Sequence, residues 1–280
     1  MTVSLTWLAL DSRKRTDILQ SFTINAVVLR ETQYKDNDII ITLLTAEKGI
    51  ITALARGILN MSSKNRPAIQ LFCYSEFEIT KYGSRYIVKS ANLKELFYNV
   101  RGDIEKYAFA CYAADAACCF CTEENDETDA FRLVLNTFAA LNNITESAKP
   151  VWQIKAAFEL KLCAVCGFMP ELNMCAECGC VKEDAENIRK KYIFSLTESS
   201  LYCEDCAKSL LGTNMSFSKL SYPVLCAMRY ISISPISRFL SFRIADESAP
   251  ELSDVCEKYL LNLAERSFDT LKYYKSLINL

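Results

Sequence analysis

Two cysteine pairs constrain this chain more than any other feature. The first reads Cys175-Ala-Glu-Cys178 and the second reads Cys203-Glu-Asp-Cys206, with 24 residues between them. Pairs with this C-x2-C spacing supply four thiolates to one tetrahedral zinc ion, at Zn–S distances of about 2.3 Å. Four thiolates leave no open position for water. The sequence therefore predicts a structural zinc ion that stabilises a loop-rich module and takes no part in chemistry.

The surroundings of the pairs refine this prediction. The gap between them exceeds the usual ~15–20 residues, so we expect a hairpin around Tyr192-Ile-Phe194. Gly179 follows the first pair, where its backbone freedom favours a tight turn. A third pair, Cys163-Ala-Val-Cys166, continues an apolar helical pattern, and we interpret it as core packing. The alternative for the four-cysteine set is a degenerate site without metal.

The length and amino-acid composition of the chain exclude several classes of protein. A length of 280 residues favours two domains, and a hydrophobic content of 51% with a net charge of -2 is typical of a globular chain. Fourteen cysteines without a secretory signal indicate a reducing cytoplasm. The chain has no run of 18 apolar residues, so no membrane span is expected. It also has no histidine, which excludes Ser-His-Asp and Cys-His catalysis and the common zinc hydrolase sites.

Charge is distributed unevenly along the chain. Residues 21–90 carry nine Lys and Arg against six Asp and Glu, a net charge of +3, although the whole chain is at -2. A mildly basic N-terminal domain on an acidic body is typical of proteins that bind nucleic acid.

The basic region has the pattern of a small β-barrel. Residues 1–20 form an extension without a clear period. Phe22, Ile24, Ala26 and Val28 then alternate, and Arg30 is next on that face. Further strands are expected at four segments: 39–44, 50–55, 69–82 and 85–89. Five strands joined by hairpin-length connections predict an OB-fold barrel over residues 21–96, with an SH3-like barrel as the alternative.

After about Leu96 the apolar period becomes helical. Helices are expected at five places: 103–121, 131–141, 151–168, after Ser216, and from about Leu252 onward to include Leu271. In the first helix we expect one buried face, formed by Tyr107, Cys111, Ala114, Cys118 and Cys121. The sequence thus predicts an α+β multi-domain protein, with a five-stranded OB-fold barrel followed by a helical domain over residues 97–280. The four-cysteine zinc module, residues 171–208, is inserted in the helical domain.

Several short motifs occur in a specific order. The barrel region contains Ala26-Val-Val-Leu29, Ala53-Leu-Ala-Arg-Gly57 and Gln70-Leu-Phe72, and Gly167-Phe-Met-Pro170 precedes the cysteine pairs. Together they resemble the bacterial RecO family of recombination mediators, over residues 22–210.

This resemblance implies a non-enzymatic role in DNA repair and recombination. The family binds and anneals DNA, single- and double-stranded, and it acts with RecR to load recombinase onto DNA coated by single-strand-binding protein. It works in the bacterial cytoplasm at the nucleoid. In the family, the acidic C-terminal tail of single-strand-binding protein docks on the helical domain. The bases available near the second and third helices are Arg132, Lys149, Lys155 and Lys161. Lys155 and Lys161 are six residues apart, so they point to different sides of a helix and do not form one compact pocket.

An OB-fold barrel binds single strands through basic groups that follow the phosphates and aromatic rings that stack on the bases. Arg56 and Lys64 are the favoured phosphate contacts, because loop chemistry and the resemblance both select them. The further candidates are Arg30, Lys35, Arg66, Lys81 and Arg85, and the candidate stacking rings are Tyr34, Tyr74, Tyr82 and Tyr86.

Two other functions compete with this interpretation. Asp36 and Asp38 are spaced to hold Mg²⁺ in a nuclease, although no third acidic ligand is apparent nearby. A thiol redox sensor would require an exposed cysteine of low pKa beside basic groups, whereas most cysteines here lie in apolar helical patterns.

Overall fold

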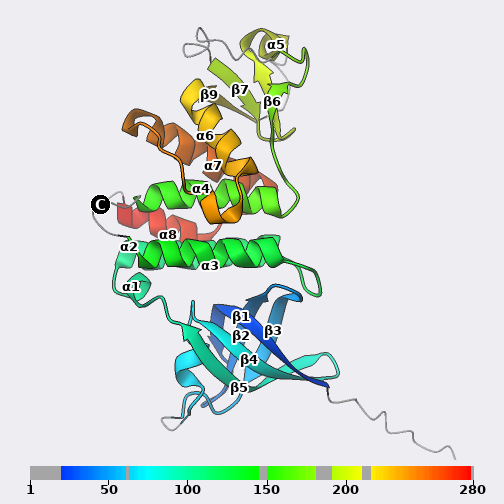
Figure 1. Cartoon of the computed structure of the whole chain (residues 1–280), viewed down its shortest axis with the longest axis vertical. Coiled ribbons are helices and arrows are strands. Elements are labelled where there is room, and N and C mark those ends of the chain that lie inside the picture. The colour runs from blue at the N-terminus through cyan, green and yellow to red at the C-terminus, as the bar shows by residue number, and fades with distance from the viewer. Residues whose placement is uncertain (1–19, 61–62, 145–149, 181–190, 210–215, 279–280) are drawn as a thin grey trace, which may run out of the picture.

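The predicted α+β architecture is confirmed. The computed structural model describes residues 20–60, 63–144, 150–180, 191–209 and 216–278. Figure 1 shows a barrel at one end of the molecule, a small sheet with the cysteine pairs at the other, and a layer of helices between them. The expected extension lies outside the described residues up to position 19.

Five strands close into the N-terminal barrel. They are β1 (Gln20–Gln33), β2 (Ile39–Thr45), β3 (Gly49–Ala55), β4 (Tyr74–Tyr82) and β5 (Arg85–Glu95). Their order is β1-β2-β3-β5-β4. β3 pairs in parallel with β5, and every other pairing in the barrel is antiparallel. This crossed order is that of an OB-type barrel and decides against the SH3-like alternative. Alternate residues of the strands, such as Ile24, Ala26 and Val28, fill the barrel interior.

A bulge in β1 changes the side of the barrel on which Arg30 lies. The register passes from Val28 opposite Leu43 to Arg30 opposite Thr42, which leaves Leu29 unpaired with β2. One extra residue moves every later side chain to the other face. Arg30 therefore shares the outer face with Thr42, and its predicted place on the inner face was wrong.

The segment before β4 also differs from the prediction. The strand expected from Ile69 begins only at Tyr74, because Arg66–Ile69 form the 3-10 helix η1. Phe72 follows in a left-handed conformation, with φ of 68°. Its ring is fully buried against Tyr107 and Phe138, at centroid distances of 5.5 and 5.1 Å. Packing of this ring between the barrel and the helices compensates for the unfavourable backbone conformation.

The three central helices lie close to their predicted ranges. After the short α1 (Tyr98–Arg101) come α2 (Ile104–Phe120), α3 (Thr128–Asn142) and α4 (Val151–Val165). The predicted buried face of α2 was wrong in part. Cys111 and Cys118 are only half-buried, whereas Phe109 and Tyr112 are fully buried. The reason is that Phe109 packs against α4 and the last helix, α8 (Asp269–Ile278). Tyr112 donates a hydrogen bond to Glu159 of α4.

The cysteine pairs belong to a second sheet. It comprises β6 (Glu171–Cys175), β7 (Lys191–Ser195), β8 (Ser200–Cys203) and β9 (Phe217–Ser221), in the order β6-β8-β7-β9. The hairpin expected around Tyr192 is confirmed as β7–β8. We expected helix directly after Ser216, but β9 comes first because it pairs along the free edge of β7. Helix α6 (Tyr222–Ile233) follows, with a proline in its first turn.

Two helices end the chain where one was expected. They are α7 (Ala249–Ala264) and α8 (Asp269–Ile278), and the 3-10 helices η3 (Ile236–Arg238) and η4 (Asp246–Ser248) precede them. The break falls at Glu265, whose φ is 51°, so Leu271 belongs to α8. Within the described parts of the chain, none of the helices has the length and apolar character needed to cross a membrane.

The barrel and the helices share one core. Val27 and Leu29 of β1, Leu44 of β2 and Phe72 are buried with the apolar residues of the helical layer. The same cluster continues into the cysteine sheet through Phe194 and other residues of that sheet. The outer face of the barrel therefore packs against the helices, while the barrel interior forms a second hydrophobic cluster.

Candidate functional site

The four predicted metal ligands converge at one end of the second sheet. Cys175 ends β6, Cys178 follows in the next turn, Cys203 ends β8 and Cys206 lies in α5 (Glu204–Ser209). All four Sγ atoms lie within 4.8 Å of one another, and those of Cys178 and Cys203 are 3.8 Å apart. A tetrahedron of sulfur atoms around zinc, with Zn–S about 2.3 Å, has edges of about 3.8 Å. This group has the composition and spacing of a metal centre.

Backbone amides stabilise the thiolate form of Cys175, which is the form that binds a metal. Burial alone would raise its pKa, but N–H groups of Cys178, Cys203 and Glu177 oppose this, and the pKa falls to about 6. The N–H of Cys203 lies 3.4 Å from Cys175 Sγ. Gly179 supports the turn with φ of 68° and donates to the carbonyl of Cys175 at 2.9 Å. Since a metal binds the thiolate, this environment favours metal binding at neutral pH.

The third cysteine pair is divided between two environments. Cys163 is fully buried in α4, which confirms its interpretation as core packing. Cys166 instead lies at the C-terminal end of α4, half-buried, in a group with Cys121 and Glu127. Sequence reasoning missed this group because Cys166 lies about 40 residues after Glu127, and only the packing of α4 brings it to Cys121 and Glu127.

The barrel carries a surface pocket where β3 and β5 meet. It has a volume of about 390 Å³, and its walls include Tyr34, Arg56, Arg85 and Tyr86. Tyr34 is 54% exposed, and Lys35 Nζ lies 5.4 Å from the centroid of its ring. Two guanidinium groups and two phenol rings thus border one hollow. Such a surface provides the groups that follow phosphates and stack on bases.

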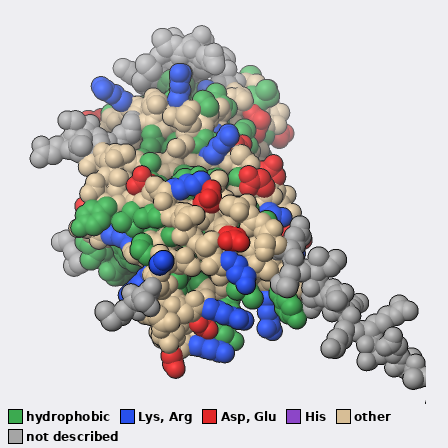
Figure 2. Space-filling view, turned by 60° about the horizontal axis from the view of Figure 1, so that its bottom comes forward, with side chains coloured by type: hydrophobic (Ala, Val, Ile, Leu, Met, Phe, Trp, Pro, Cys, Tyr) green, Lys and Arg blue, Asp and Glu red, His purple; other side chains and the backbone are tan. Residues whose placement is uncertain are grey.

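The remaining basic candidates are distributed around the barrel. Lys64 is exposed before η1, and Arg66 lines a separate pocket beside Ile58. Arg30 and Lys81 instead have acidic partners in the helical domain. Arg30 pairs with Asp115 at 2.6 Å and Lys81 pairs with Glu124 at 3.2 Å. Figure 2, which turns the barrel end of the molecule forward, shows several Lys and Arg side chains in its lower part, next to hydrophobic ones.

Comparison with known families is decisive at this point. A family profile described as "Recombination protein O N terminal" matches residues 19–97, and one described as "Recombination protein O C terminal" matches residues 101–272. The chain belongs to the RecO family. The first match covers all five barrel strands, and the second covers the central helices and the cysteine sheet.

Curated RecO proteins match over nearly the whole chain. The "DNA repair protein RecO" of Acetivibrio thermocellus is 29% identical over 253 residues, which cover 90% of this chain and 96% of the relative. The protein of the same name from Dehalococcoides mccartyi is 26% identical over 256 residues, covering 91% and 96%. That of Desulforamulus reducens is 25% identical over 262 residues, covering 92% and 96%. The resemblance inferred from the motifs is confirmed.

The geometry does not favour the nuclease alternative. Asp38 Oδ1 accepts a hydrogen bond from the N–H of Gly57 at 2.8 Å, and Asp36 is exposed. In the part of the chain that the structure describes, neither aspartate belongs to a group of three residues spaced to hold a metal. The curated RecO relatives are named as DNA repair proteins. A redox sensor would need an exposed thiol of low pKa, but burial raises the pKa of Cys73, Cys111 and Cys118 to about 11. Cys175, whose pKa is lowered, is buried in the four-cysteine group.

The helical domain of this RecO-family chain has its own pocket. It has a volume of about 660 Å³, and Arg132, Leu135, Lys161, Val165 and Ile236 are among the residues that line it. Lys161 Nζ donates to the carbonyls of Ser232 and Ser234, at 2.8 and 2.5 Å, which fixes the chain after α6.

Lys155 lines a different pocket, so the expected separation of Lys155 from Lys161 is confirmed. Lys149 lies outside the described residues.

Proposed function

We propose that this chain is a non-enzymatic recombination mediator. In this proposal it binds single- and double-stranded DNA, anneals complementary strands, and acts with RecR to load recombinase onto DNA coated by single-strand-binding protein, at the nucleoid in the bacterial cytoplasm. The observation that supports it best is the basic and aromatic pocket on an OB-type barrel, in a chain of a family whose relatives are named as DNA repair proteins.

The proposed DNA contact begins in the barrel pocket. Arg56 and Arg85 follow the phosphates, and Tyr34 and Tyr86 stack on the bases. Lys35, Lys64 and Arg66 extend the path of positive charge on the barrel. Arg30 and Lys81 are engaged with acidic partners, so they contribute less than the sequence alone predicted. Phosphate contacts carry no sequence information, which suits a protein that must act on any strand.

We further propose that the metal at the four-cysteine centre is zinc. Four thiolates at tetrahedral spacing suit this ion and leave no position for substrate. The residues that would hold it are Cys175, Cys178, Cys203 and Cys206. Its role is to stabilise the second sheet.

The DNA contact is tested by charge removal in the pocket. Replacing both Arg56 and Arg85 by alanine should weaken binding of single-stranded DNA on the order of tenfold, equally for all sequences, because two phosphate contacts are lost. The wild-type slope of log K against log salt should be on the order of −2 to −4, and the variant slope should be shallower by about 1.4. Fluorescence anisotropy with labelled oligonucleotides over a range of salt concentrations measures both quantities.

The control removes the same charge elsewhere. Lys258 and Lys272 are exposed bases on α7 and α8, and their double alanine variant should bind DNA like the wild type. If the two double variants lose affinity equally, only net charge matters and the pocket is not the contact. Cleavage of the labelled strands in Mg²⁺ would instead support the nuclease.

We also propose that the helical pocket receives the C-terminal tail of single-strand-binding protein. Such a tail is acidic and ends in phenylalanine. The apolar wall formed by Leu135, Val165 and Ile236 suits the ring, and Arg132 at the rim suits the acidic groups.

The tail contact is tested with the intact chain, because the helices share their core with the barrel. Arg132→Glu should weaken binding of a tail peptide at least about tenfold, since it replaces an attractive charge by a repulsive one. Isothermal titration calorimetry measures this, and Lys272→Glu on α8 is the matched control. Equal binding by wild type and Arg132→Glu would place the tail elsewhere.

A further inference from the structure

Three potential metal ligands meet at the ends of three helices, outside the four-cysteine set. Cys121 caps the C-terminus of α2, Glu127 caps the N-terminus of α3, and Cys166 caps the C-terminus of α4. One ligand atom of each lies within 4.8 Å of the other two. Neither the proposed DNA surface nor the tail pocket includes these residues.

The carboxylate of this group is buried without a charged partner. Glu127 is 8% exposed, and among the described residues no salt bridge reaches it. Its Oε1 atom accepts from the N–H of Thr122 at 3.0 Å, and also from the Thr122 hydroxyl and the Asn125 amide, both at 3.3 Å. These donors are neutral. Buried carboxylates are normally paired with a positive charge or bound to a metal, so this carboxylate is suited to bind a cation.

The helix geometry adds to the attraction for a cation. Two helices, α2 and α4, direct their C-terminal ends at the group, and helix C-termini carry partial negative charge. Cys121 is 5% exposed and Cys166 is half-buried. A cation placed between them would face two thiols, one carboxylate and two helix C-termini, against the partial positive charge of one helix N-terminus, that of α3.

The barrel holds the ligand loop in place. The N–H of Glu127 donates to the carbonyl of Ala46 at 2.8 Å, and the N–H of Ile50 donates to the carbonyl of Thr122 at 2.9 Å. The turn between β2 and β3 thus fixes the loop that carries Glu127 next to Cys121. The positions of the ligands depend on main-chain contacts between the barrel and the helices.

We propose that Cys121, Glu127 and Cys166 form a second binding site for a divalent transition metal, with zinc the best fit. Two thiolates and one carboxylate are typical zinc ligands, and three protein ligands leave a fourth position for water. In a tetrahedral site the ligand atoms are about 3.5–3.8 Å apart, so small side-chain rotations bring the three into place. The ion displaces the two thiol protons to solvent and neutralises the buried carboxylate. Bound metal links the ends of α2, α3 and α4 beside the barrel.

The second site differs from the four-cysteine centre in a measurable way. It has one ligand fewer and an open position, and Cys166 is within reach of solvent. We therefore expect it to bind metal more weakly and to lose it first to a chelator.

The test measures the number of zinc ions bound per full-length chain. Wild-type protein, reduced and dialysed against a zinc buffer, should hold two zinc ions per chain by atomic emission, and Cys166→Ser and Cys121→Ser should each hold one. Cys119→Ser is the matched control, since this neighbouring half-buried cysteine lies outside the group, and it should keep two. With Co²⁺ in place of zinc, the sulfur-to-metal absorbance of Cys166→Ser should fall to about two-thirds, because four of six thiolate ligands remain.

Folding and oxidation are controlled in the same samples. Circular dichroism identifies a variant that has merely unfolded, and Glu127→Gln, which keeps the side-chain shape, should also lose the second ion. One zinc per chain in the wild type, or two in folded Cys166→Ser, would overturn the proposal. So would an intact mass lower by two hydrogens in zinc-treated wild type, since the two thiols would then form a disulfide.

Discussion

Cys203→Ser should lose the metal of the four-cysteine centre and unfold the second sheet. Apparent binding free energies of structural zinc reach about 10–16 kcal/mol, and this energy is available only to the folded site. Because Phe194 and Leu201 of the sheet belong to the core of the helices, unfolding of the sheet also exposes that core. We expect the melting temperature to fall by about 10 °C or more. Differential scanning calorimetry and zinc analysis on the same sample measure the two effects.

The matched control is Cys180→Ser. Cys180 lies two residues after Cys178, is exposed and is not part of the four-cysteine group. This variant should keep its zinc and its melting temperature. Cys163→Ser should also keep the zinc, although its buried position makes it less stable. If Cys203→Ser retained full zinc and stability, the centre would be a chance cluster of thiols without a structural metal.

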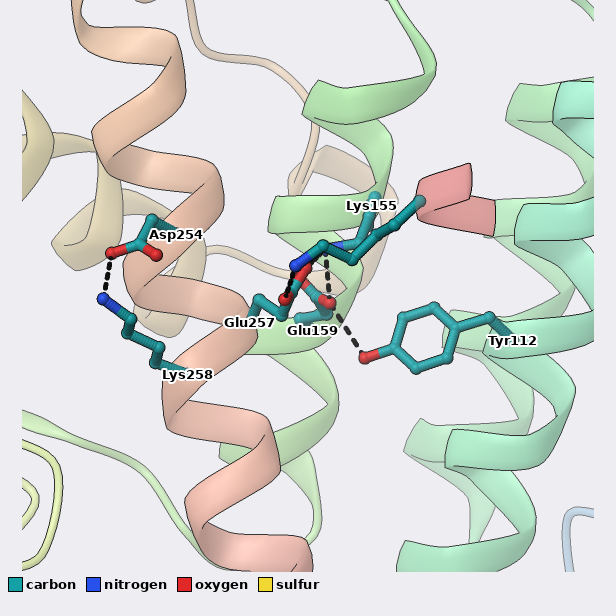
Figure 3. Close-up of polar contacts among 7 residues, drawn as sticks. Tyr112, Lys155, Glu159, Asp254, Glu257 and Lys258 are labelled. Carbon is teal, nitrogen blue, oxygen red and sulfur yellow. Dashed lines mark hydrogen bonds and ion pairs between the residues drawn. The ribbon is translucent and has the colours of Figure 1, made fainter. Parts of the chain in front are cut away.

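Lys155→Met should destabilise the helical domain by about 3–5 kcal/mol, because it leaves the fully buried Glu159 without its counter-ion. Glu257 keeps its pair with Lys275, at 2.6 Å. Lys155 Nζ lies 2.8 Å from a carboxylate oxygen of both Glu159 and Glu257, and its side chain is 3% exposed. The Tyr112 hydroxyl donates to Glu159 at 2.8 Å, as Figure 3 shows. The other oxygen of Glu159 is buried with no hydrogen-bond partner. Chemical denaturation of the two proteins measures the difference.

Lys258→Met is the matched control for this prediction. Lys258 forms a similar pair with Asp254 on α7, also drawn in Figure 3, but both side chains are more than half exposed. An exposed pair at this helical spacing contributes only about 0.3–0.5 kcal/mol. The two variants remove the same charge, but Lys155 is buried between two carboxylates and Lys258 is exposed beside one. Equal losses of stability would contradict the assignment of a buried ion pair.

The destabilisation by Lys155→Met should depend on pH. Burial already raises the pKa of Glu159 above its usual 4.5, and loss of the opposing Lys155 charge raises it further. A carboxyl whose pKa is higher in the folded state binds more protons there, so stability falls as pH rises above the unfolded value. The difference from wild type should therefore be larger at about pH 7.5 than at about pH 5.5. A difference that does not change with pH would mean that Glu159 remains ionised in the variant.

Short-range sequence patterns were sufficient to predict much of this protein's structure. The two C-x2-C pairs predicted the four-cysteine group that could hold a metal, because each pair is formed by one turn and depends on few distant residues. Alternation of apolar residues located the barrel strands, and the 3.6-residue period located α2, α3 and α4. The break at Glu265 was missed, because no glycine or proline marks this left-handed turn between α7 and α8.

Contacts between distant segments decided which charges are paired and which side chains meet. A single bulge at Leu29 moved Arg30 from the barrel interior to the outer face and its pairing with Asp115. The sequence placed Lys155 among the bases available near the second and third helices, and its burial between Glu159 and Glu257 became apparent only once α7 lay beside α4. Cys121, Glu127 and Cys166 meet only because α4 ends beside the loop where α2 ends and α3 begins. The sequence by itself determined most of the helices and strands and the four-cysteine set, since these follow from neighbours within a few residues. The tertiary structure decided which charges are paired and which ligands meet, because those depend on the register and packing of segments far apart in the chain.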